Sequence, residues 1–81
     1  MKNKITVSPK NDQLNFFFHY GSKKIFLFSQ RFSKAVFHFF LHGKTESEIL
    51  SYKRWNQNPR LDKTIEKIPM YLRYIRKEVI A

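Results

Sequence analysis

The chain has 81 residues, with 16 lysines and arginines against 6 aspartates and glutamates, and its formal net charge at pH 7 is +10. A chain of this length is predicted to form one small domain over residues 1–81, with little room for an enclosed active-site cavity. It has no cysteine, which excludes disulfides and thiolate metal sites. The charge predicts affinity for nucleic acid, an anionic membrane or an acidic protein.

The N-terminal sequence lacks the features of a secretory signal. Met1–Lys4 is not followed by an apolar core of about 7–15 residues. The longest apolar run, Val36–Leu41, is interrupted by His38 and is far shorter than the roughly 20 residues of a membrane span. We therefore expect a cytoplasmic protein without a membrane span.

All nine phenylalanines lie between Leu14 and Leu41, and this stretch organises the predicted fold. Two apolar runs in it, Leu14–Tyr20 and Lys23–Phe32, flank the dipeptide Gly21-Ser22. Glycine at the first central position of a two-residue loop favours a type II′ turn, so the two runs are predicted to form a β-hairpin.

The turn sets a register in which Tyr20 pairs with Lys23, Phe18 with Ile25 and Phe16 with Leu27. The second face of the hairpin then carries Phe17, Phe26, Phe28 and Phe32. An antiparallel sheet with one wet side alternates apolar and polar residues, so we expect a helix, a second chain or a ligand to cover this face.

A third strand is predicted from the β-prone run Lys4–Val7, which is followed by the turn-forming residues Ser8–Asp12. It is expected to pair at the edge of the hairpin. Three strands with an apolar face are about the minimum for a stable sheet.

Two short helices are predicted after the strands. The first spans residues 34–42, with Ser33 as N-cap and Gly43 as terminator. Its expected buried stripe is Phe32, Val36, Phe39 and Phe40. The second spans Glu46–Trp55, begins with a capping box between Thr45 and Glu48, and is expected to bury Ile49 and Leu50.

The last segment has the clearest helical periodicity. Its apolar seam, spaced 4, 3, 4, 3 and 4, consists of Leu61, Ile65, Ile68, Leu72, Ile75 and Val79. Pro69 removes one hydrogen bond, which predicts a kink or a restart near Ile68. The predicted fold class is α+β: a three-stranded antiparallel meander followed by three helices (βββααα), the last kinked near Pro69.

The run from Lys53 to Arg60 combines cations, a tryptophan and amides. Arginine and lysine neutralise phosphates, asparagine and glutamine can bind base edges, and an exposed tryptophan can stack on a base. Further cations lie off the seam of the last helix. The predicted nucleic-acid-binding residues are Lys53, Arg54, Trp55, Asn56, Gln57, Asn58, Arg60, Lys63, Lys67, Arg73, Arg76 and Lys77.

Two other nucleic-acid surfaces are conceivable. Phe17, Phe26 and Phe28, flanked by Lys24 and Arg31, follow the logic of sheets that stack unpaired bases, although the alternative is that these rings are covered. A helix-turn-helix is disfavoured because its second helix would open with two glutamates, which repel phosphates.

The main functional prediction is a non-catalytic nucleic-acid-binding module for DNA or RNA, without a cofactor and with a tendency to form a homodimer. One alternative is a small accessory protein that docks an acidic protein. The other is a small ribonuclease or toxin. His38 and His42, four residues apart, are the only candidates for an acid–base or metal pair, and no further ligand is apparent.

Overall fold

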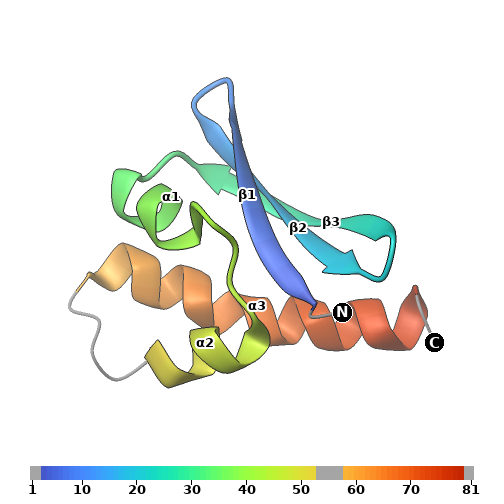
Figure 1. Cartoon of the computed structure of the whole chain (residues 1–81). Helices are drawn as coiled ribbons and strands as arrows, with labels where there is room; N and C mark the ends of the chain where they lie inside the picture. Colours follow the sequence, from blue (N-terminus) through green and yellow to red (C-terminus); the bar gives the residue numbers. More distant parts are fainter. Residues whose placement is uncertain (1–2, 53–57, 80–81) are drawn as a thin grey trace.

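The computed structural model describes residues 3–52 and 58–79. Three strands, β1 (Lys4–Lys10), β2 (Gln13–Tyr20) and β3 (Lys23–Arg31), are followed by α1 (Lys34–Phe40), α2 (Glu46–Tyr52) and α3 (Pro59–Glu78). The strands form one antiparallel sheet in the order β1-β2-β3, and α3 runs the length of the molecule beside it (Figure 1). The predicted α+β fold with the order βββααα is confirmed.

Both hairpin turns have the backbone geometry that their residues favour. Gly21 has a φ of +60° and Ser22 has no positive φ, as a type II′ turn requires. Asn11 and Asp12 have φ values of 51° and 61°, the pattern of a type I′ turn. The predicted turn over Ser8–Asp12 was too long: β1 continues to Lys10, because an edge strand tolerates Pro9.

A β-bulge changes the predicted register of the second hairpin. The pairs Tyr20–Lys23 and Phe18–Ile25 form as predicted, but Phe17 then pairs with Phe26 and Phe16 with Phe28. Leu27 is therefore the extra residue, and the predicted pairing of Phe16 with Leu27 was wrong. Because one inserted residue exchanges the two faces of a strand, Phe28 turns inward.

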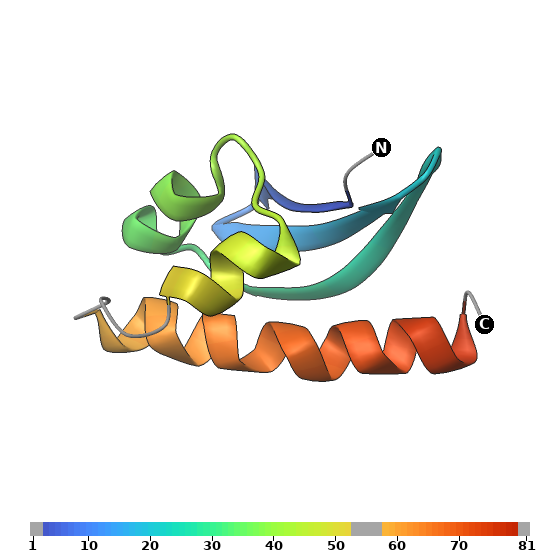
Figure 2. The same cartoon turned by 60° about the horizontal axis from the view of Figure 1, so that its bottom comes forward.

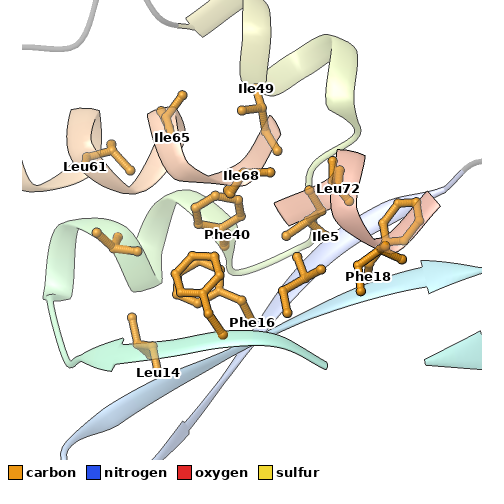
Figure 3. Packing of buried hydrophobic residues seen from close by; sticks show 14 residues of the cluster. Ile5, Leu14, Phe16, Phe18, Phe40, Ile49, Leu61, Ile65, Ile68 and Leu72 are labelled. Atoms are coloured by element: carbon orange, nitrogen blue, oxygen red, sulfur yellow. The ribbon is translucent and has the colours of Figure 1, made fainter. Parts of the chain in front are cut away.

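The core lies between the inner face of the sheet and the three helices (Figure 3). Phe16 is completely buried at its centre. Its ring stacks on Phe28 with 4.5 Å between centroids and meets the Phe40 ring edge-on at 5.4 Å. Aromatic burial thus supplies much of the stabilisation that a cysteine-free chain of this size needs.

Helix α3 supplies the largest helical share of the core. Five of the six predicted seam residues are buried, and these are Leu61, Ile65, Ile68, Leu72 and Ile75. Val79 lies beyond the helix end and is exposed. The helix continues without interruption through Pro69, so no restart occurs at Ile68 (Figure 2). In the described part of the chain, no helix has the length and apolar character needed to cross a membrane.

Helix α1 ends at Phe40, two residues earlier than predicted. The Gly43 N–H donates to the Phe40 carbonyl at 2.9 Å, and its φ of +81° fits the predicted terminator. Ser33 has extended N-cap geometry but its side chain makes no capping bond. Val36 and Phe40 are buried as predicted, whereas Phe32 is exposed.

The capping box at the start of α2 is confirmed. The Thr45 N–H donates to Glu48 at 3.0 Å, and the Glu48 N–H donates to the Thr45 hydroxyl at 3.2 Å. The bond from the Thr45 backbone holds the pKa of Glu48 below its usual value. Ile49 is buried, but Leu50, predicted to point inward, is exposed. The predicted helix end at Trp55 lies outside the described residues.

The outer face of the sheet differs from the prediction. None of the described helices packs on it, because the buried residues of all three belong to the cluster on the inner face. The bulge reduces the aromatic surface on this face. It moves Phe28 to the core, and Phe32 lies beyond the end of β3, so Phe17 and Phe26 are the two phenylalanines left on this face.

Candidate nucleic-acid interface

Strand β3 and helix α3 run side by side in opposite directions along one edge of the molecule (Figure 2). Two hollows lie between them, and all of their described lining residues belong to these two elements. Lys67 lines one hollow, and Met70 and Tyr71, about one turn further along α3, line the other. We call the two hollows together the β3–α3 groove, with a basic half and an aromatic half.

The basic half has a volume of about 240 Å³. Its lining residues are Gln30, Arg31, Arg60, Lys63, Thr64 and Lys67. Four of these six described residues are cations and none is acidic. Such a concentration of positive charge in one hollow favours an anionic ligand.

The helix start fixes the position of the cations on α3. Asn58 caps the helix, its side-chain oxygen accepting from the N–H groups of Arg60 at 3.0 Å and Leu61 at 3.3 Å. Arg60, Lys63 and Lys67 are spaced by three and four residues, so they share one side of the helix next to the buried seam. That side lies against β3, from which Arg31 joins the three α3 cations.

A partly buried hydrogen bond joins the two walls of the basic half. The Thr64 hydroxyl lies 3.0 Å from the side-chain oxygen of Gln30 on β3, to which it donates. The same hydroxyl lies 3.0 Å from the Arg60 carbonyl within the helix. Because Thr64 is buried, this contact fixes the separation of β3 and α3 where the cations gather.

The aromatic half is larger, with a volume of about 420 Å³. Its lining residues are Phe26, Leu27, Met70, Tyr71, Tyr74 and Ile75. Phe26, Met70 and Tyr74 are each more than half exposed, at 53%, 63% and 59%. The Tyr71 ring stacks on the core residue Phe28 at 4.7 Å, which holds it in place on the groove wall.

The predicted binding residues do not all lie at the β3–α3 groove. Arg60, Lys63 and Lys67 line the basic half, and Asn58 caps the helix beside it. Arg73 and Lys77 are exposed on α3 but line neither half. Five further candidates, Lys53, Arg54, Trp55, Asn56 and Gln57, lie outside the described residues.

Arg76 joins two helices. Its guanidinium forms an ion pair with the Glu46 carboxylate at the start of α2, and this partner raises the pKa of Arg76. The guanidinium carbon also lies 5.7 Å from the centroid of the Phe18 ring. Its charge is therefore already compensated within the fold.

The outer face of the sheet retains part of the predicted aromatic platform. The rings of Phe17 and Phe26 meet edge-on at 5.8 Å, and Lys24 Nζ lies 4.3 Å from the Phe17 ring centroid. Phe28, the third predicted member, faces the core instead. Phe26 also lines the β3–α3 groove, so it connects the two surfaces.

No further metal-binding side chain joins His38 and His42 in the described part of the chain. His38 lies in α1 and His42 follows it, and both are exposed. No group of three or more histidine, aspartate or glutamate side chains that could hold a metal occurs among residues 3–52 and 58–79.

Sequence reasoning missed Met70, Tyr71 and Tyr74 as site residues, and it placed Arg31 beside the aromatic sheet platform and not beside α3. The signal for the α3 members was a second stripe beside the seam, Lys63, Lys67, Met70 and Tyr74, spaced 4, 3 and 4. Arg31 had no local signal for this position, because only the packing of β3 on α3 brings it to this stripe.

Comparisons with protein-family models, curated proteins and solved structures found no match to the chain.

Proposed function

We propose that the protein is a non-catalytic nucleic-acid-binding module that contacts phosphates through the basic half of the β3–α3 groove. The observation that supports this is the convergence of Arg31, Arg60, Lys63 and Lys67 on one hollow, whose described lining includes no acidic residue. Lysine and arginine side chains that neutralise phosphates release counterions, which supplies most of non-specific nucleic-acid affinity. A nucleic-acid partner also agrees with the cytoplasmic location predicted from the sequence.

A pair of matched variants tests the position of the interface. Arg60→Gln/Lys67→Gln removes one arginine and one lysine from the basic half, and Arg73→Gln/Lys77→Gln removes the same residue types from α3 outside the groove. Each variant lowers the formal net charge by two, from +10 to +8. All four side chains are exposed, so both variants should fold.

We expect Arg60→Gln/Lys67→Gln to bind a single-stranded oligonucleotide about 25-fold more weakly at 0.1 M salt, since each phosphate contact contributes about 0.7 to the log–log salt slope. The control variant should stay within about threefold of the original protein. Fluorescence anisotropy with a labelled oligonucleotide measures both affinities. Equal losses in the two variants would mean that total charge, and not the groove, determines binding.

The two alternative functions are tested with the same protein. Polyglutamate is the probe for an acidic protein partner, and binding as tight as that of the oligonucleotide would favour this alternative. Incubation with labelled RNA detects a ribonuclease. Cleavage that disappears in His38→Ala or His42→Ala would overturn the non-catalytic assignment.

Self-association remains a separate prediction. Phe17 and Phe26 leave aromatic surface on a sheet face on which none of the described helices packs, and exposed apolar surface of sufficient area commonly marks an interface. We expect a homodimer of the 9.9 kDa chain at tens of micromolar protein, measured by sedimentation equilibrium. A monomer at this concentration would contradict the prediction.

A further inference from the structure

We infer that the β3–α3 groove selects single-stranded nucleic acid, with phosphates in its basic half and unpaired bases stacked on Phe26 and Tyr74 in its aromatic half. This inference rests on the proposed function and adds the class of ligand to it. It concerns the aromatic half, which is the larger of the two hollows. Phosphate contacts in the basic half do not explain the exposed rings there.

The aromatic half is accessible to a ligand. Phe26 on β3 and Tyr74 on α3 line the same hollow from opposite walls, and both rings are more than half exposed. Leu27 and Ile75, which are buried, belong to the same lining. A slot between two exposed rings over an apolar lining suits a flat, partly apolar group such as a base.

The two halves follow one another along α3. The stripe Lys63, Lys67, Met70 and Tyr74 passes from the basic to the aromatic half along a single side of α3. From Arg60 to Tyr74 the helix rises about 21 Å, which corresponds to about six nucleotides at the stacked spacing of about 3.4 Å. A short strand can therefore contact cations with its backbone at one end and rings with its bases at the other.

Charge complementarity selects this occupant over a second copy of the chain. The groove places four lining cations next to the exposed rings, and each copy carries a formal net charge of +10. A polyanion with aromatic bases complements both halves, whereas another copy brings further positive charge to the basic half. A duplex complements the basic half alone, because its bases are already stacked and only their edges are accessible in the grooves.

The test compares a short oligothymidylate, the RNA oligouridylate of equal length, and the DNA duplex containing the same thymidines. We expect the original protein to bind both single strands at least tenfold more tightly than the duplex. The comparison of oligothymidylate with oligouridylate distinguishes a DNA ligand from an RNA ligand. A preference for one of them identifies the sugar that the groove accepts.

The variant Phe26→Ala/Tyr74→Ala removes both rings from exposed positions. Each stacked base is worth a factor of about five or more in affinity, so we expect a loss of about 25-fold for single strands and none for the duplex. The salt slope should not change, because the phosphate contacts remain. Tyr74→Phe keeps the ring and should retain full affinity. The control Tyr20→Ala/Tyr52→Ala removes two exposed rings outside the groove and should bind like the original protein.

A direct spectroscopic signal completes the test. The fluorescence of 2-aminopurine within the oligonucleotide should be quenched on binding to the original protein, but not to Phe26→Ala/Tyr74→Ala.

If single strand and duplex bind equally and the ring variant is unaffected, the stacking inference is overturned while the proposed function stands. If no probe binds at micromolar protein, the proposed function itself fails. A shift of the ring variant from dimer to monomer in sedimentation, with unchanged oligonucleotide affinity, would assign its rings to an interface between copies and overturn the stacking inference.

Discussion

The affinity of the protein for a short single strand is expected to fall about 50-fold when the salt concentration rises from 50 to 200 mM. Four cations line the basic half of the groove. Each phosphate contact on a single strand contributes about −0.7 to the slope of the logarithm of the binding constant against the logarithm of the salt concentration. Four contacts therefore predict a slope of about −2.8. A fourfold increase in salt then lowers the affinity by about 1.7 decades.

The same titration on Arg60→Gln/Lys67→Gln should give a slope of about −1.4, because two of the four phosphate contacts are lost. Arg73→Gln/Lys77→Gln should keep the original slope, since neither residue lines the groove. Anisotropy titrations at several salt concentrations provide these slopes. A slope near zero in the original protein would exclude phosphate contacts as the source of affinity, whereas a slope much steeper than −3 would mean that cations outside the basic half also engage.

Replacing Phe16 by alanine is expected to lower the free energy of unfolding by about 3–5 kcal/mol. The Phe16 ring is completely buried and contacts the rings of Phe28 and Phe40, so its removal leaves a cavity shared by β2, β3 and α1. A domain of this size has a total stability of only about 4–12 kcal/mol. The variant should therefore be partly or largely unfolded at 37 °C.

The neighbouring Phe17 provides the control for this experiment. It lies on the same strand but faces the uncovered side of the sheet, where Phe26 and Lys24 are its ring contacts. We expect Phe17→Ala to cost about 1 kcal/mol, as is usual for partly exposed positions. Urea denaturation followed by circular dichroism measures both variants. Equal losses of stability would contradict the assignment of Phe16 to the centre of the core.

Residue patterns within single elements were sufficient to predict most of the secondary structure. The 4-3 spacing from Leu61 to Ile75 can bury five side chains only as a helix, and Gly21-Ser22 favours a tight hairpin turn. Thr45 and Glu48 form a capping box because the bonds involved link residues three apart in the chain. Each of these features depends on local geometry, which the sequence specifies directly.

The sequence predicted the candidate site only in part. It indicated that Arg60, Lys63 and Lys67 share one side of a helix, since helical spacing alone decides this. It gave equal weight to Arg73, Lys77 and Arg76, because nothing local distinguishes a cation beside a groove from one elsewhere on the helix. The ion pair of Arg76 with Glu46 joins residues thirty positions apart and has no sequence pattern.

Two features were decided by the tertiary structure alone. The first is the β-bulge at Leu27, which turns Phe28 into the core, where its ring stacks between Phe16 and Tyr71. The second is the groove, which exists because α3 packs along β3 in the opposite direction and so brings Arg31 to Arg60, and Phe26 to Tyr74. Both depend on contacts between residues distant in the chain, whose free energy is set by shape and burial and not by the periodicity of either segment.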